Sequence, residues 1–128
     1  ASSSNLQDAL ALWQATNSTV GFNHGFGSAT DKQAVLLETM KGNSAVFYAN
    51  DDREKDLVVD GQQIGQARPE AVYRTNHGYD KYTIEHYMWN NTGAYKDSIQ
   101  RYMLFPQMFD AYQASKTPIT YVEALNVT

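Results

Sequence analysis

The sequence predicts an α+β fold, with antiparallel strands in the first part of the chain and helices in the second. Two observations support this prediction. Short apolar runs bounded by turn residues precede the segment 73–80. Beyond that segment, apolar residues recur at helical spacing. With 128 residues, of which 42% are hydrophobic, the chain is long enough to bury a core, and we expect residues 1–128 to form a single unit.

The composition narrows the classes of function. The net charge of −4 and the lack of a basic stripe give no reason to expect a nucleic-acid partner. No apolar run approaches the roughly 20 residues that a transmembrane helix needs, so we expect no such segment. The chain has no cysteine, which excludes thiolate catalysis, disulfides and cysteine-ligated metal within this chain.

Three Asn-x-Ser/Thr sequons occur, at Asn17, Asn90 and Asn126, and none has proline in its middle position. Such sequons accept N-linked glycans in proteins of the secretory route. Their number favours a glycosylated protein that is lysosomal or extracellular. The alternative is that the three sequons arose by coincidence.

The first part of the chain is divided by glycine and polar turns. Leu6, Leu10 and Trp13 recur at helical spacing, with Asn5 placed to cap the helix start. The predicted elements are a helix over 5–15, a strand over 19–23, a glycine-rich loop over 23–28, and a hairpin of strands 33–40 and 43–49 that turns at 41–43. The first hairpin strand is apolar through its middle, so we expect both of its faces to be covered.

Residues 50–60 carry five acidic and two basic side chains, which predicts a solvated loop. The pair Asp51–Asp52 lacks the spacing of a calcium-binding loop, so an exposed charged turn is the preferred interpretation. Asp60 and Gly61 form a turn signal, and residues 62–67 are expected to extend again.

The sequence pattern of the later part of the chain predicts helices. Residues 79–89 form the first, and Asp97, with Gln100 in capping-box position, is expected to start the second. Pro106 predicts a kink or break in that helix because proline has no backbone N–H. Thr117 and Pro118 are typical of a helix start, here of a short helix toward Leu125.

The segment 73–80 concentrates polar chemistry where extended chain is expected to give way to helix. A carboxamide such as that of Asn76 can stabilise a developing oxyanion. Arg74, two residues away, would share its strand face and provide a fixed cation for a polar substrate group. The alternative is an ordinary turn, with Asn76 capping and Gly78 at a positive φ.

Metal and cofactor motifs are lacking. His24, His77 and His86 have no metal-ligand spacing, so we expect no metal site. A Gly-x-Ser-x-Gly elbow is absent, and Gly25 and Gly27 lack the remainder of a nucleotide-binding fingerprint, so no cofactor is expected.

Several stretches together resemble the acyltransferase and amidase branch of the N-terminal-nucleophile (Ntn) hydrolases, which includes the penicillin acyltransferase-like proteins and, more distantly, acid ceramidase. The stretches that carry the resemblance are 38–39, 47–48, 73–80 and 97–102. The resemblance implies an αββα sandwich and an N-terminal cysteine nucleophile whose own α-amine is the base. It also implies that Asn76 contributes to the oxyanion hole, with Arg74, His77 and Tyr79 binding substrate or supporting the site.

This chain departs from that family pattern. It begins with Ala1 and has no cysteine, and the early and final strands of the sandwich are not recognisable. We therefore expect an internal fragment of a processed precursor, part of one larger αββα domain in a hetero-oligomer. A companion chain would carry the N-terminal cysteine, and the substrate would be a small N-acyl compound, for example a ceramide-like lipid amide.

Two other functions remain open. The chain could belong to a catalytically inactive family member that serves as a storage, structural or binding glycoprotein. It could also be an autonomous small binding domain, in which case it would be stable and monodisperse without partners.

Overall fold

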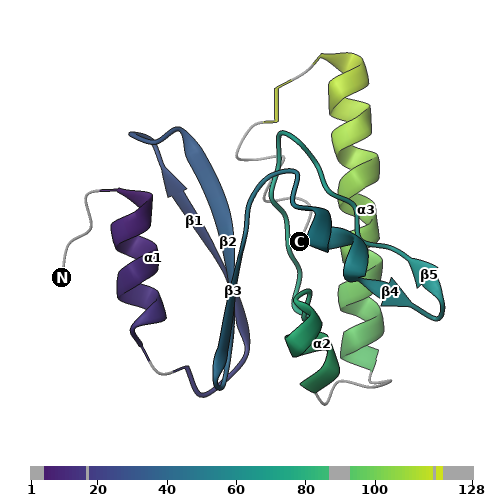
Figure 1. The fold of residues 1–128 in the computed structure, drawn as a ribbon. Coiled ribbons are helices and arrows are strands. Elements are labelled where there is room, and N and C mark those ends of the chain that lie inside the picture. Colours follow the sequence, from purple (N-terminus) through teal and green to yellow (C-terminus); the bar gives the residue numbers. More distant parts are fainter. Residues whose placement is uncertain (1–4, 17, 87–92, 117, 120–128) are drawn as a thin grey trace.

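The structure, a computed structural model, describes residues 5–16, 18–86, 93–116 and 118–119, with only the backbone of 93–95. The chain is α+β (Figure 1). Its elements in order are α1 (Leu6–Gln14), β1 (Phe22–Ser28), β2 (Gln33–Met40), β3 (Asn43–Phe47), the 3₁₀ helix η1 (Asp52–Asp56), β4 (Val58–Val59), β5 (Gln62–Gln63), α2 (Lys81–His86) and α3 (Gly93–Ser115).

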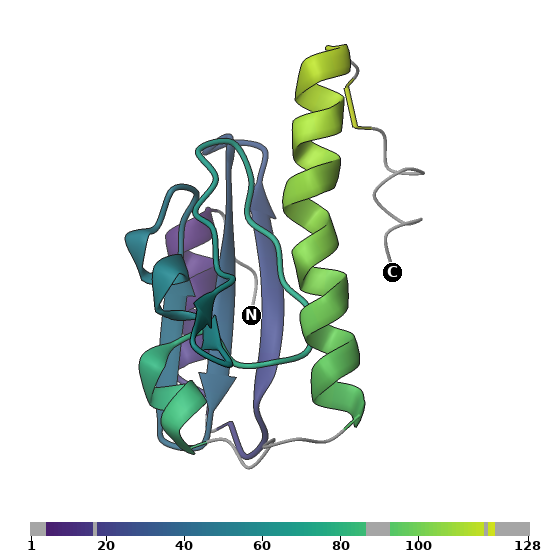
Figure 2. The same ribbon diagram turned by 90° about the vertical axis from the view of Figure 1, so that its right-hand side faces the viewer.

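The described residues form successive layers around a small antiparallel sheet of order β1-β2-β3. Helix α1 covers one face of the sheet (Figure 1). The other face is covered by the segment from η1 to α2, which includes the β4-β5 hairpin, and α3 runs alongside this layer (Figure 2). No helix in the described part of the chain has both the length and the apolar character of a membrane-spanning segment.

Helix α1 confirms the helix predicted for 5–15. Asn5 is its N-cap, since its side-chain oxygen accepts a hydrogen bond of 2.8 Å from the backbone N–H of Asp8. Leu6 and Leu10 are buried on the face that packs against β2. The amphipathic pattern therefore identified both the helix and the side that it buries.

The β2-β3 hairpin is also confirmed. Its turn contains Gly42, whose φ of 80° lies in the left-handed region that glycine adopts readily. Alternate side chains of β2 enter different clusters. Val35 and Leu37 pack with α1, whereas Leu36 packs with β3 and the later part of the chain. Both faces of β2 are covered, as its apolar sequence predicts.

The predictions for the segment before this hairpin were wrong. Strand β1 covers Phe22–Ser28, where a glycine-rich loop was expected, and not 19–23. Every residue of β1 has a partner on β2, from Phe22 opposite Thr39 to Ser28 opposite Gln33. Pairing along the whole strand stabilises a conformation that its two glycines would not favour alone.

The predicted solvated loop over 50–60 is also wrong in part. Asp51 caps η1 by accepting a hydrogen bond from the backbone N–H of Arg53, and the next residues fold inward. Glu54 and Leu57 are only 6% and 2% exposed. The turn signal is confirmed, because Asp60 and Gly61 have φ values of 51° and 78° and connect β4 to β5.

The helices of the later part begin at different residues from those predicted. Asp80 starts α2, since its carboxylate accepts a 3.0 Å hydrogen bond from the backbone N–H of Tyr82. Residues 87–89 of the predicted helix lie outside the described residues. Asp97 is not an N-cap, because α3 already begins at Gly93. Asp97 instead forms an i,i+4 ion pair of 3.0 Å with Arg101.

Helix α3 continues through Pro106, so of the predicted kink or break the break is wrong. Proline removes one helical hydrogen bond, a local cost that tertiary packing can offset. Residues on both sides of Pro106 pack on the same cluster: Ile99, Tyr102, Phe105 and Phe109. The helix predicted from Pro118 toward Leu125 lies almost entirely outside the described residues.

Gly65 lies where the β4-β5 hairpin returns to η1, and its close packing can be tested. A Cβ atom at this position would lie 1.7 Å from the backbone oxygen of Glu54. Because a backbone oxygen moves only if the chain moves, we expect Gly65→Ala to lower the free energy of unfolding by about 3 kcal/mol, measured by urea denaturation. Gly27→Ala is the control, because a Cβ there meets nothing within 4 Å. Equal stability of the two variants would contradict this packing.

Candidate functional site

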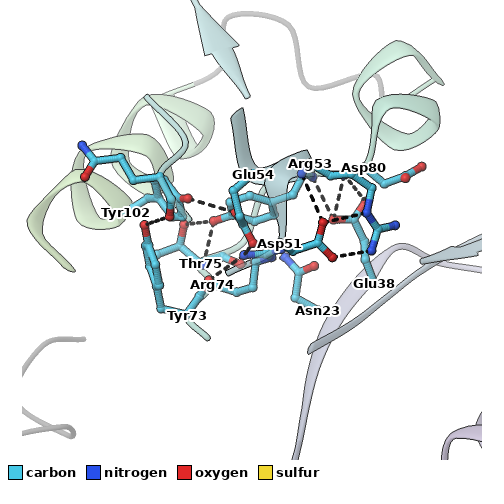
Figure 3. A network of polar contacts seen from close by, with 12 residues as sticks. Asn23, Glu38, Asp51, Arg53, Glu54, Tyr73, Arg74, Thr75, Asp80 and Tyr102 are labelled. Atoms are coloured by element: carbon cyan, nitrogen blue, oxygen red, sulfur yellow. Dashed lines mark hydrogen bonds and ion pairs between the residues drawn. The ribbon is translucent and has the colours of Figure 1, made fainter. Parts of the chain in front are cut away.

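The segment 73–80 lies between the sheet and α3 and is held to the sheet by two side chains (Figure 3). Asn23 of β1 donates from Nδ2 to the carbonyl oxygens of Thr75 and His77, at 2.8 and 2.9 Å. Glu38 of β2 accepts from the backbone N–H of Tyr79 at 2.8 Å and from that of Asp80 at 3.2 Å. The backbone of this irregular segment is thus paired with side chains of the sheet.

A buried polar cluster holds the same segment to α3. The Oγ of Ser98 accepts a 2.8 Å hydrogen bond from the backbone N–H of Asn76 and lies 2.8 Å from Nδ1 of His77. Thr75 donates from Oγ1 to the carbonyl of Ser98 at 2.9 Å. The hydroxyl of Tyr79 accepts from the backbone N–H of Thr75 at 3.0 Å. These bonds fix the backbone on both sides of Asn76.

Asn76 itself is exposed, between the buried Thr75 and His77. Its Oδ1 accepts a 2.9 Å hydrogen bond from a terminal guanidinium nitrogen of Arg101. Because this bond fixes the carboxamide by its oxygen, the Nδ2 group is left on the opposite branch as a donor. Asn76 also lines a shallow surface pocket, whose other walls include Phe22, Glu38, Gly78 and Thr83.

Arg74 lies in the interior. Its guanidinium is 2.6 Å from a carboxylate oxygen of Glu54, and the two side chains are only 4% and 7% exposed. The guanidinium carbon also lies over the rings of Phe47 and Tyr79, at 4.4 and 4.0 Å from their centroids. Residues 71–75 form no strand, so the expectation that Arg74 shares a strand face with Asn76 is wrong. Arg74 supports the segment and is not presented to the surface.

Burial controls the titration of this cluster. It lowers the pKa of His77 from its ordinary value of 6.5 to about 3, with the charges of Arg74 and Arg101 adding to the effect. His77 is therefore neutral at physiological pH. Burial also raises the pKa of Tyr79 and that of Glu38. His77 and Tyr79 are 1% and 0% exposed, so both support the site from inside, and His77 also contributes to the lining of the small pocket beside Asn76.

Sequence reasoning missed several residues that organise the site: Asn23, Glu38, Ser98 and Arg101. One signal was available for Glu38. A carboxylate directly after the apolar run 35–37 of a buried strand has to find hydrogen-bond donors in the interior. Nothing local in the sequence marks Asn23, because its partners are backbone carbonyls more than 50 residues away.

The two other histidines do not join this cluster. His24 lies beside Trp13 on the α1 face, and His86 stacks on Tyr82 within α2. The described residues include no group of three His, Asp or Glu side chains that could hold a metal ion. The acceptor asparagines of the three sequons, Asn17, Asn90 and Asn126, lie outside the described residues.

Comparisons with models of known protein families, with curated proteins and with solved structures found no match to this chain.

The buried ion pair of Arg74 and Glu54 predicts a strong effect on stability. Arg74→Met leaves the Glu54 carboxylate buried without its cation, and we expect the free energy of unfolding to fall by about 3 to 5 kcal/mol. The double variant Arg74→Met/Glu54→Leu removes both charges and should recover much of this loss. Urea denaturation of wild type and the two variants measures both effects. A double variant less stable than Arg74→Met would show that the pair is not the cause.

The lowered pKa of His77 predicts a dependence of stability on pH. At mildly acidic pH the unfolded chain protonates this imidazole and the folded chain does not, so stability falls as the pH falls from above 6.5 toward 3. Between about pH 7 and about pH 5 this residue should remove about 2 kcal/mol from the free energy of unfolding. Buried Glu38 and Glu54, whose pKa values are raised, have the opposite effect.

The contribution of His77 to the pH dependence of stability can be measured by comparing a variant that lacks the imidazole with wild type. We expect urea denaturation to show a smaller loss of stability on acidification in His77→Gln than in wild type, by about 2 kcal/mol over this range. His86→Gln, which removes an exposed imidazole outside the buried cluster, is the control for the loss of a histidine as such. A wild-type profile in His77→Gln would show that the imidazole is not buried in its neutral form.

Proposed function

We propose that this chain is one polypeptide of an Ntn-type cysteine amidase or acyltransferase that acts on the C–N bond of an N-acyl substrate. The chain supplies an oxyanion-stabilising carboxamide, Asn76, to a larger αββα domain. A companion polypeptide of the same precursor supplies the N-terminal cysteine. The sequons support a glycosylated protein of the secretory route, lysosomal or extracellular.

One observation supports this proposal above the others. Asn76 is an exposed carboxamide whose backbone and side-chain oxygen are both held, by Ser98 and Arg101 respectively. A donor that is fixed before the substrate arrives needs no reorganisation as negative charge develops, which is the property that makes an oxyanion hole effective.

The proposed chemistry assigns a limited role to this chain. The thiolate of the companion's cysteine adds to the amide carbonyl, and its α-amine accepts the thiol proton. The carbonyl oxygen becomes an oxyanion that accepts a hydrogen bond from Nδ2 of Asn76. Collapse of this intermediate returns the proton from the α-ammonium to the leaving nitrogen, breaks the C–N bond and releases the amine, and it leaves an acyl-enzyme that water or an acceptor then cleaves. The ceramide-like character of the substrate rests on the family resemblance.

Asn76→Ala tests the role of the carboxamide. Since it removes one oxyanion donor, we expect turnover of an N-acyl substrate to fall roughly 100-fold or more, with the fold retained in circular dichroism. The assay uses the assembled protein produced from its precursor. Gln100→Ala, an exposed carboxamide deletion on α3, is the control and should leave turnover unchanged.

Two outcomes would contradict the proposal. The first is an Asn76→Ala variant that folds and turns over the N-acyl substrate at the wild-type rate. The second is a companion chain, identified by mass spectrometry of the intact complex, that does not begin with Cys, Ser or Thr. Either outcome would favour a storage, structural or binding glycoprotein without catalysis.

A further inference from the structure

A pocket lies at one end of the sheet, between the C-terminal end of α1 and the β2-β3 turn (Figure 1). It has a volume of about 210 Å³. Its lining comes from three places in the sequence: the end of α1 with the residues that follow it, the end of β2, and the turn with the start of β3. Pockets that hold drug-sized ligands have volumes of roughly 300 to 1,000 Å³, so this pocket suits a smaller molecule.

The lining of this pocket is polar but uncharged. None of the described residues that line it is acidic or basic, and most of them carry a hydroxyl or a carboxamide group. Recognition of a phosphate or carboxylate commonly uses arginine or lysine, and recognition of a cation uses a carboxylate. The lining therefore favours a neutral ligand that makes several hydrogen bonds.

Three polar groups of the lining are held in place by the protein itself. Thr16 donates from Oγ1 to the backbone carbonyl three residues earlier, at 2.6 Å, and Ser18 donates from Oγ to the backbone carbonyl two residues later, at 2.9 Å. Asn43 donates from Nδ2 to the carboxylate of Asp80 at 3.2 Å. The two hydroxyl oxygens and Oδ1 of Asn43 keep lone pairs that can accept further hydrogen bonds. A ligand with several hydroxyl donors would therefore meet acceptors whose positions are already fixed.

Trp13 adds an aromatic wall to the same pocket. Its ring centroid lies 4.6 Å from that of His24 and 6.2 Å from that of Phe26, in edge contacts with interplanar angles of 64° and 63°. These contacts hold the indole, while 39% of Trp13 stays exposed. The face of an aromatic ring is the negative part of its quadrupole, so it attracts C–H groups that carry partial positive charge. A sugar ring has such C–H groups on one face and hydroxyl groups around its rim, which is the combination that this lining matches.

We propose that this pocket binds one neutral sugar residue, whose apolar face packs on Trp13 and whose hydroxyl groups bond to the three fixed acceptors. The sugar has two candidate sources. One is a glycan on Asn17 of this chain, since Thr16 and Ser18, the two sequence neighbours of Asn17, both line the pocket. The other is a saccharide of another molecule, which would present the same chemistry to the pocket. The site does not depend on the proposed function, because binding a sugar requires neither Asn76 nor a companion chain.

Sugar binding to Asn17→Gln, which cannot carry the neighbouring glycan, tests the pocket itself. The methyl β-glycoside of N-acetylglucosamine is titrated into the full protein with this substitution, and saturation-transfer NMR gives the Kd. In the same background, Trp13→Ala removes the aromatic wall, and Ser44→Phe fills the pocket from an exposed strand position. We expect each to raise the Kd at least 10-fold. Leu12→Ala is the matched control and should leave the Kd unchanged, because Leu12 is exposed on α1 beside Trp13 but lies outside the pocket lining.

The same titration of the wild-type glycoprotein identifies the source of the sugar. Binding to Asn17→Gln but not to wild type would show that the chain's own glycan occupies the pocket. Equal binding to both would show that the pocket takes a saccharide of another molecule. The proposal is overturned if Asn17→Gln binds no sugar, or if adding Ser44→Phe leaves its Kd unchanged. It is also overturned if the anionic sugar N-acetylneuraminic acid binds as tightly as the neutral one.

Discussion

The fold depends on satisfying the backbone of an irregular segment, 73–80, that lies inside the molecule. A buried N–H or C=O group without a partner costs about as much free energy as a lost hydrogen bond. The sheet supplies partners through Asn23 and Glu38, and α3 supplies one through Ser98. Three separate elements must therefore be in place before the segment is stable, which links the N-terminal sheet to the C-terminal helix.

Segment 73–80 also depends on η1, through a buried ion pair. Arg74 and Glu54 neutralise each other, and the hydroxyl of Tyr102 donates to the same carboxylate at 3.2 Å. A buried ion pair adds little net stability, because desolvation offsets much of the attraction. It does penalise alternative arrangements, since moving either partner leaves a charge unpaired in the interior. The pair therefore acts mainly to fix how the segment packs against η1.

Local sequence patterns identified much of the fold but few of the residues that hold the candidate site in place. Helix α1 and the β2-β3 hairpin were predictable because apolar periodicity and turn residues act over a few positions. Strand β1 was not, because its glycines favour a loop until pairing with β2 is considered. For the site, the sequence singled out Asn76, which the structure places at the surface between two buried neighbours. The burial of Arg74 depends on Glu54, 20 positions earlier in a stretch whose charges indicated solvent.

The position of Asn76 follows from the same constraint that organises the fold. Its neighbours Thr75 and His77 are buried and hydrogen-bonded, so the backbone at Asn76 has little freedom to move. Arg101 then fixes the side chain through its oxygen. The cost of ordering this carboxamide is thus met during folding and not when a ligand binds, which is the condition for a pre-organised donor. Arg101 thus adds a side-chain restraint to the backbone restraint that the buried neighbours of Asn76 impose.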